Sequence, residues 1–176
     1  GKIYSGNYRQ IGSKSWNFGQ FEDEILDCVM YLLDISINFN LRGNPVRVAR
    51  VISAIVNGPD DNGVLAGNWS GDYSGGTRPT KWAGSVAILK QFWKTKETVK
   101  WGQCWVFSGI TTTVSRALGL PARSVTNFAS AHDTDGSCTI DKHLTEDGDD
   151  MNYWLDDSVW NFHVWNEAWV KRCDLP

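Results

Sequence analysis

The stretch Trp101-Gly-Gln-Cys-Trp-Val-Phe-Ser108 carries the strongest structural and chemical signals in the chain. It opens a run over residues 104–118 with apolar or small side chains at helical spacing, which stops at Gly119 with Pro121 just beyond. Glycine after the last turn and proline beyond it are typical of a helix C-terminus. We therefore predict a helix that starts near Gly102 or Gln103 and carries Cys104 in its first turn.

The position of Cys104 has two interpretations. The free N–H groups and partial positive charge of a helix N-terminus favour the thiolate, which is the nucleophilic form of cysteine. An apolar helix, in contrast, raises the pKa of a thiol and makes cysteine a packing residue.

A nucleophilic cysteine needs a base, and the chain has three histidines. His163 lies in a strand-like alternating segment beside aromatic residues, whereas His132 and His143 lie in acidic or charged polar segments. Cys104 and His163 are therefore the candidate catalytic pair. A core histidine without chemistry is the alternative for His163.

Length and composition limit the class of protein. A chain of 176 residues can form one domain with its own core. A net charge of −3 argues against a nucleic-acid partner, and no apolar run approaches the ~18 residues of a transmembrane helix. Four irregularly spaced cysteines form neither a zinc motif nor a disulfide framework. We expect a cytoplasmic protein, with an extracellular or membrane-anchored parent as the alternative.

Apolar spacing predicts further helices over residues 22–34, 45–57 and 82–94, with Phe21 on the inward face of the first and Asn44 capping the second. After Pro121 the pattern becomes extended and predicts strands over 124–128, 137–140 and 160–170. Helices followed by an antiparallel set of strands indicate an α+β fold.

Two oxygen-rich turns are candidate cation sites. Around Gly136, oxygen side chains alternate as in loops that bind Ca²⁺, and Asp156 or Asp157 could complete the shell, although the EF-hand glutamate is absent. A solvated acidic turn is the alternative. The second turn, residues 57–62, gives a weaker signal. The alternating residues are Asp133, Asp135, Ser137 and Thr139.

Trp69 and Trp160 lie beside polar turns and outside the apolar runs. Because an indole N–H only donates hydrogen bonds, such residues can line a channel and stabilise a developing oxyanion. Burial in the core is the alternative for either tryptophan.

Several longer motifs resemble the catalytic core of the animal transglutaminases, the Ca²⁺-dependent protein-glutamine γ-glutamyltransferases. The resemblance covers essentially all of residues 1–176 and implies a papain-like cysteine-proteinase-type core, truncated at both ends. The N-terminal β-sandwich and C-terminal β-barrels of the family would lie outside the chain. The motifs, in family order, are residues 16–22, 60–69, 101–107, 119–123, 126–128, 130–135 and 157–163.

The resemblance also implies a role for each candidate residue. Cys104 matches the nucleophile and His163 its base, while the third triad member, an aspartate, would lie beyond the end of the chain. Trp69 and the Cys104 backbone N–H match the oxyanion donors, and Trp160 matches the second wall of the acyl-donor tunnel.

Two Ca²⁺ sites are implied in the same way. Ser137 and Pro59 stand where relatives often carry asparagine, and Pro59 would contribute its carbonyl oxygen. The ligands would be Asp133, Asp135, Ser137, Thr139 and Asp157 at the channel-side site, and Ala54, Asn57, Pro59 and Asp61 at the tight structural site.

The implied reaction is Ca²⁺-dependent acyl transfer from a protein glutamine side chain to lysine or another primary amine, through a thioester on Cys104, with release of ammonia. The partners would be protein substrates bearing reactive glutamine and lysine, or small primary amines. The alternative is a papain-like thiol peptidase or glutamine deamidase, which uses the same pair. Without the third triad member, we expect the isolated chain to turn over weakly at most.

Overall fold

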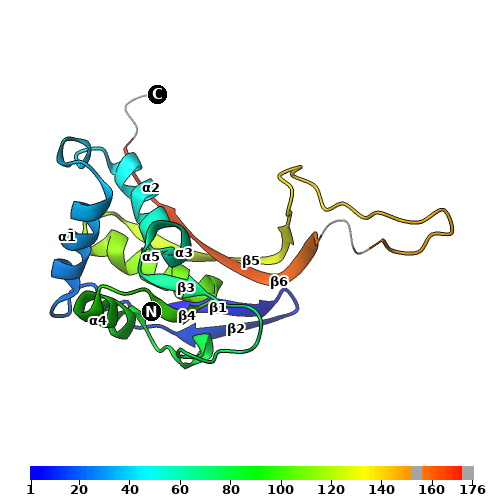
Figure 1. Ribbon diagram of the computed structural model, residues 1–176, viewed down its shortest axis with the longest axis horizontal. Helices are drawn as coiled ribbons and strands as arrows, with labels where there is room; N and C mark the ends of the chain where they lie inside the picture. Colours follow the sequence, from blue (N-terminus) through cyan, green and yellow to red (C-terminus); the bar gives the residue numbers. More distant parts are fainter. Residues whose placement is uncertain (152–155, 172–176) are drawn as a thin grey trace. The chain divides into compact units, whose positions relative to one another are not determined.

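A computed structural model describes residues 1–151 and 156–171, except for the side chains of residues 60 and 61. Figure 1 labels the elements, which are β1 (Lys2–Asn7), β2 (Gln10–Ser15), α1 (Ile25–Ser36), η1 (Phe39–Leu41), α2 (Pro45–Ile55), α3 (Gly58–Asp61), β3 (Leu65–Gly67), η2 (Pro79–Lys81), α4 (Ser85–Thr95), β4 (Val99–Gly102), α5 (Cys104–Ala117), β5 (Ala122–His132) and β6 (Ser158–Ala168). In sequence, the helices are grouped between the strand pairs β1–β2 and β5–β6, and the strands of the described residues form three separate two-stranded sheets, which confirms the predicted α+β class.

The chain divides into two compact units, each described here by itself. Unit 1 comprises residues 1–3, 14–125 and 164–176, and unit 2 comprises residues 4–13 and 126–163. Among the described residues, every buried hydrophobic side chain belongs to unit 1. The hydrophobic core is therefore a property of unit 1.

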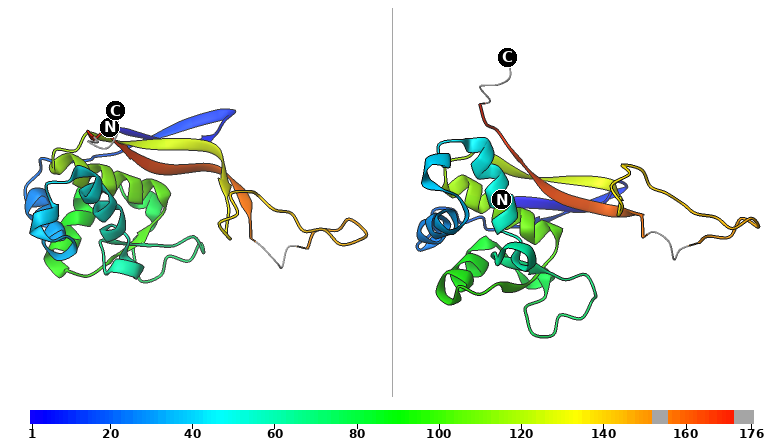
Figure 2. Two further views of the ribbon diagram at one scale, coloured as in Figure 1. Left: turned by 90° about the horizontal axis from the view of Figure 1, so that it is seen from above. Right: turned by 45° about the horizontal axis from the view of Figure 1, so that its top comes forward.

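Unit 1 is built around α5, whose Val106, Ile110 and Val114 are at most 1% exposed. α1, α2 and α4 each contact α5, and the views in Figure 2 show them gathered around it. Gly109 allows close packing, because a Cβ there would lie 2.4 Å from Nε1 of the buried Trp16. Burial of these apolar faces supplies the main driving force for the helical layer.

The predicted helices are present; α2 starts at Pro45 as predicted, whereas α1 and α4 start about three residues later than predicted. α1 begins at Ile25, after Glu24 in a left-handed conformation (φ 69°). Phe21 therefore precedes the helix and is 88% exposed, so the prediction that it faces inward was wrong. Asn44 caps α2 as predicted, since its Oδ1 accepts hydrogen bonds from two backbone N–H groups at 3.0 and 3.2 Å.

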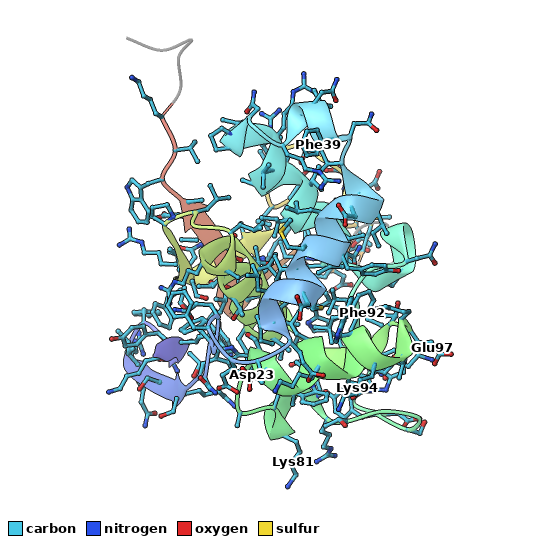
Figure 3. The ribbon with its side chains drawn as sticks, turned by 90° about the vertical axis from the view of Figure 1, so that its left-hand side faces the viewer. Asp23, Phe39, Lys81, Phe92, Lys94 and Glu97 are labelled. Carbon is cyan, nitrogen blue, oxygen red and sulfur yellow. The ribbon has the colours of Figure 1, made fainter. Side chains whose placement is uncertain are left out.

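α4 packs against α1 through its apolar face, with Phe92 1% exposed and its ring 6.5 Å from that of Tyr31. In Figure 3, Phe92 lies at this contact, while the exposed Lys94 and Glu97 lie on the outer side. The split between apolar and charged residues on α4 is thus the one expected of an amphipathic helix.

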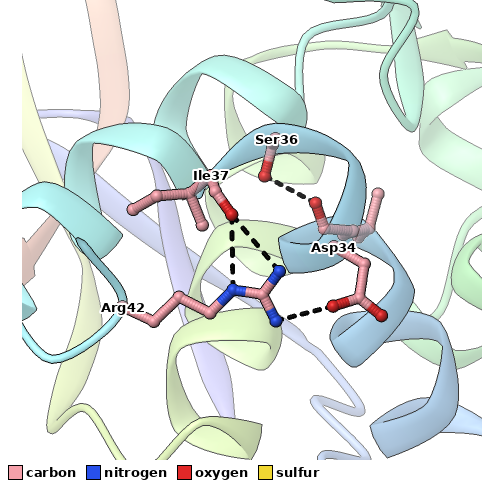
Figure 4. Close-up of polar contacts among 5 residues, drawn as sticks. Asp34, Ser36, Ile37 and Arg42 are labelled. Carbon is pink, nitrogen blue, oxygen red and sulfur yellow. Dashed lines mark hydrogen bonds and ion pairs between the residues drawn. The ribbon is translucent and has the colours of Figure 1, made fainter. Parts of the chain in front are cut away.

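Arg42 holds the end of α1 in place. Its guanidinium donates from Nε and Nη2 to the Ile37 carbonyl oxygen, at 3.3 and 3.2 Å, and from Nη1 to Asp34 Oδ1 at 2.6 Å (Figure 4). The last turn of α1 carries no basic residue of its own. The guanidinium of Arg42, which lies in the segment after α1, therefore supplies the positive charge and hydrogen-bond donors that the C-terminus of the helix lacks.

The strands differ more from the predictions than the helices do. β5 and β6 pair with each other. β5 extends beyond the predicted segment 124–128 at both ends, and β6 is displaced toward the N-terminus from the predicted segment 160–170. The hairpin β1–β2 and the parallel pair β3–β4, with Leu65 opposite Val99, were not predicted. The predicted strand over 137–140 is a loop, because its backbone N–H groups bond to nearby Asp and Ser side chains and not to a neighbouring strand.

Candidate active site

Cys104 is the first residue of α5 and is 8% exposed. The carbonyl oxygen of Gln103, the N-cap residue, accepts hydrogen bonds from Val106 N–H at 2.8 Å and Phe107 N–H at 3.1 Å, which starts the helix. The predicted placement of Cys104 in the first turn is therefore correct.

The thiol of Cys104 experiences two opposing influences. Burial raises its pKa above the ordinary value, and hydrogen bonds with the backbone N–H groups of Val164 and Trp105 and of Cys104 itself act in the opposite direction. Burial is the larger influence, so the neutral thiol is favoured in the structure. Val164, whose N–H reaches the sulfur, directly follows His163 in the chain.

A polar network fastens β6 to α5 next to this cysteine. Ser108 Oγ donates to the Trp165 carbonyl oxygen at 2.9 Å and bonds to Ser124 Oγ at 2.8 Å. Asn166 Nδ2 donates to the Ser108 carbonyl oxygen at 3.0 Å and to Thr112 Oγ1 at 2.8 Å. The sequence patterns used above did not predict this network. Its signal in the sequence is a pair of hydroxyl residues four positions apart on an otherwise apolar helix face.

The two faces of β6 differ in unit 1. Val164 is 3% exposed, whereas Trp165 on the other face is 41% exposed and Trp169, which directly follows the strand, is 54% exposed. Strict alternation along this segment would place both tryptophans on the same face as His163. In unit 1 both tryptophans are more exposed than Val164.

Trp69 follows β3 in unit 1 and is 56% exposed. Its ring lies against Gly67, since a Cβ there would lie 2.4 Å from a ring carbon. The neighbouring Asn68 accepts a hydrogen bond from Gln103 Nε2 through its carbonyl oxygen at 3.0 Å. The sequence identified Trp69 but missed Gln103, whose partner lies 35 positions away.

Trp160 and His163 belong to unit 2, where they form an aromatic cluster with His132. The Trp160 and His132 rings stack with centroids 4.5 Å apart at 13°, and the Trp160 and His163 rings meet edge to face at 5.2 Å. Burial, followed by the charge of His132, lowers the pKa of His163 below the ordinary value. His132 is exposed, and it lies at the end of β5, where its ring contributes to this cluster.

The acidic loop of unit 2 brings Asp133, Asp135 and Asp157 together, with one carboxylate oxygen of each within 4.8 Å of the others. Backbone N–H groups of Cys138 and Asp135 lower the pKa of Asp133, and the Thr134 hydroxyl lowers that of Asp157. Asp133 and Asp157 are thus favoured in their charged form.

Ser137 and Thr139, the other predicted ligands in this loop, bond to each other. Their hydroxyl oxygens lie 2.9 Å apart, and Thr139 Oγ1 donates to Asp141 Oδ1 at 2.8 Å. The structure therefore groups the three predicted carboxylates with one another and the two hydroxyls with Asp141.

The second predicted cation site lies in unit 1 between α2 and β3. The Ala54 carbonyl oxygen accepts a hydrogen bond from Asn57 N–H at 2.9 Å, and Asn57 is the N-cap residue of the short α3 that contains Pro59. The side chain of Asp61 lies outside the described residues. The described part of this turn is compact, and its role as a cation site stays a prediction.

Comparison with known proteins identifies the family. The model of the transglutaminase-like superfamily matches residues 68–174, which include Trp69, Cys104 and the acidic loop. The chain belongs to the transglutaminase-like superfamily. This confirms the family resemblance of its motifs.

Curated proteins match this transglutaminase-like chain over nearly its whole length. Human protein-glutamine gamma-glutamyltransferase K is 56% identical over 100% of the chain and 22% of its own length. Annulin of Schistocerca americana is 54% identical over 99% of the chain and 23% of its own length. The hemocyte enzyme of Tachypleus tridentatus, also a protein-glutamine gamma-glutamyltransferase by name, is 51% identical over 100% of the chain and 23% of its own length. The chain thus spans under a quarter of these relatives.

The crystal structure of red sea bream transglutaminase matches the whole chain with a TM-score of 0.91 at 45% identity, over 28% of its own chain. The predicted transglutaminase core fold is confirmed by this match. Within the described part of the chain, every helix is too short or too polar to cross a lipid bilayer.

Proposed function

We propose that the protein carrying this chain is a Ca²⁺-dependent protein-glutamine γ-glutamyltransferase. The main support is the position of Cys104 at the first residue of α5, where the backbone N–H groups of Val164 and Trp105 hydrogen bond with its sulfur. Relatives named protein-glutamine gamma-glutamyltransferase match the chain over its full length. A buried thiol with such donors is suited to covalent acyl chemistry.

In the proposed reaction, Cys104 gives its proton to the imidazole of His163 and its sulfur attacks the carboxamide carbon of a glutamine side chain. The carbon–nitrogen bond breaks, His163 returns the proton to the departing ammonia, and a thioester remains on Cys104. A lysine or other primary amine then attacks the thioester and loses a proton through His163. The products are an isopeptide bond and the free thiol.

The tryptophans have separate proposed tasks. The indole N–H of Trp69 and the backbone N–H of Cys104 donate to the oxyanion that develops on the substrate carbonyl. Trp160 forms part of the wall that keeps water from the thioester and favours the amine as acceptor.

The carboxylates of the acidic loop fit a Ca²⁺ ion. Oxygen atoms around one Ca²⁺, at about 2.3–2.6 Å from it, can be about 5 Å apart, and the three carboxylates meet this spacing. When bound, the ion supplies positive charge that offsets the mutual repulsion of Asp133, Asp135 and Asp157. Ser137 and Thr139 would add neutral oxygens to this set. Ala54, Asn57, Pro59 and Asp61 are the proposed ligands of the second Ca²⁺.

Incorporation of a labelled primary amine into a glutamine-bearing protein tests the proposed reaction in the full-length protein. We expect incorporation that requires Ca²⁺ and is abolished by Cys104→Ala, while Cys28→Ala, at a buried cysteine of α1, retains it. Incorporation by Cys104→Ala would contradict the proposal. Ammonia release without amine incorporation would instead identify a glutamine deamidase.

The Ca²⁺ proposal is tested separately with Asp133→Asn combined with Asp135→Asn. Removing two charged ligands should raise the Ca²⁺ concentration needed for half-maximal binding by about tenfold or more, measured by calorimetry as well as by activity. Asp147→Asn is a matched control, because Asp147 is an exposed acid of the same loop outside the cluster. An unchanged binding midpoint in the double variant would refute the site.

A further inference from the structure

We propose that Gln103 is a positioning residue that fastens the segment carrying Trp69 to the start of the catalytic helix. This inference rests on the proposed function, in which Trp69 donates to the oxyanion. It concerns a side chain adjacent to Cys104 that is not a reacting group in the proposed mechanism.

The carboxamide of Gln103 reaches two points of one loop. Its Nε2 donates to the Asn68 carbonyl oxygen at 3.0 Å and to the Tyr73 hydroxyl at 3.1 Å. The two acceptors lie on either side of Trp69 in sequence. A single amide group therefore closes the segment from residue 68 to residue 73 against the helix start.

The backbone of the same residue organises the nucleophile. The Gln103 carbonyl oxygen accepts the first N–H bonds of α5, from Val106 and Phe107. The next residue is Cys104. One residue therefore links the position of the sulfur to that of the Trp69 segment.

The segment has little internal freedom between these points. Asn68 Nδ2 donates to the Asp72 carbonyl oxygen at 2.7 Å, and Ser70 N–H donates to Asn68 Oδ1 at 2.9 Å. Asn68 N–H also donates to the Gly102 carbonyl oxygen at 3.0 Å. Because these bonds hold the loop as one turn, the Gln103 bonds, together with the Asn68 N–H bond to Gly102, set the position of the turn as a whole.

The ring of Trp69 is otherwise weakly restrained. It is 56% exposed, and one edge of its ring lies against Gly67. A donor that is not enclosed by packing depends on its backbone for its position. Small displacements of such a donor are costly, because it acts only at the short distance needed in the transition state.

Gln103→Met in the full-length protein tests the proposal, since methionine keeps the length of the side chain and removes the donor. We expect kcat for amine transfer to fall about tenfold with little change in KM for the glutamine substrate, because the lost interaction acts in the transition state. Tyr73→Phe, which removes one of the two bonds, should cause a smaller loss. Gln91→Met is the matched control at an exposed glutamine of α4.

Two further measurements distinguish positioning from a general structural effect. In a Trp69→Phe background, Gln103→Met should reduce kcat little further, because the donor it positions is already absent. Equal losses in both backgrounds would overturn the proposal. Hydrogen exchange of the amides of residues 68–73 should accelerate in Gln103→Met, and unchanged exchange there would also overturn it.

Failure of the proposed function would give a different result. If the wild-type protein transferred no amine, the reaction proposed above would be wrong, and the exchange measurement alone would decide whether Gln103 fastens the loop. Alkylation of Cys104 by iodoacetamide should proceed at the wild-type rate in Gln103→Met, since no oxyanion forms. A large loss of alkylation rate would show that Gln103 acts on the nucleophile and not on Trp69.

Discussion

At the scale of single residues, burial acts on the two candidate catalytic side chains in opposite senses. It raises the pKa of the Cys104 thiol and lowers the pKa of His163, and each change favours the neutral form. In the proposed reaction, two neutral side chains can exchange a proton when substrate arrives, without a desolvated ion pair having to persist beforehand. The resting side chains are therefore expected to be a thiol and an imidazole.

His132 offers a test of the electrostatic part of this account. Its charge lowers the pKa of His163, so His132→Asn should raise that pKa toward the ordinary value, while burial keeps it below. The imidazole proton resonances, followed by NMR as the pH is lowered, report the midpoint. His143→Asn, at an exposed histidine of the acidic loop, should leave the midpoint unchanged. A midpoint that stays the same in His132→Asn would contradict the assigned cause.

The same shift gives the pH dependence of activity. Because the folded pKa of His163 lies below that of an ordinary histidine, the neutral imidazole persists to lower pH than usual. The midpoint of the acidic limb of the kcat/KM–pH profile should therefore lie below about pH 6.5. It should move toward that value in His132→Asn, and a movement in the opposite direction would show that another group controls the limb.

At the scale of secondary structure, helices were predictable where their signals are local. The start of α5, its end near Gly119 and the Asn44 cap all depend on residues a few positions apart. β3 and β4 could not be found in this way, because strands of three and four residues carry little periodicity and pair with a distant segment. The Gln103–Asn68 contact escaped prediction for the same reason, whereas the Asp133 loop was found because its carboxylates alternate in sequence.

Gly63 provides a prediction at this scale, since it lies where the turn after α2 meets β3. A Cβ at this position would lie 1.9 Å from the Ile55 carbonyl oxygen and 2.7 Å from that of Asn57. Both contacts are with backbone, so Gly63→Ala should destabilise the protein by about 1–3 kcal/mol or more, measured by urea unfolding. Gly43→Ala is the control, because a Cβ there meets nothing within 4 Å. Equal stability of the two variants would contradict the packing described here.

At the scale of the whole molecule, stability is unevenly distributed between the two units. The described buried hydrophobic residues all belong to unit 1, and the described residues of unit 2 include the exposed Tyr4, Tyr8 and Ile11. Regions with few buried apolar contacts open at a lower free energy than the core does. Unit 2 should therefore open without global unfolding.

Native-state hydrogen exchange measures this difference directly. Amides of α5 should exchange only through global unfolding, while those of β5 beyond residue 125 should exchange through smaller openings that are insensitive to low denaturant. The two segments of β5 fall in different units, so the strand supplies its own internal comparison. Equal protection along β5 would show that the units unfold as one.

The hydrogen bonds of Asp157 should keep the two fragments of the chain associated after proteolytic cleavage in the acidic loop. Its carboxylate accepts from Thr134 N–H and Oγ1 at 2.8 and 2.6 Å and from Asp141 N–H at 3.1 Å, which ties the two feet of the acidic loop together. Trypsin cutting after the exposed Lys142 would sever the loop beyond these clamps. The two fragments should then co-elute in size-exclusion chromatography and separate only in denaturant. An unchanged native mass would therefore not prove that the backbone is intact.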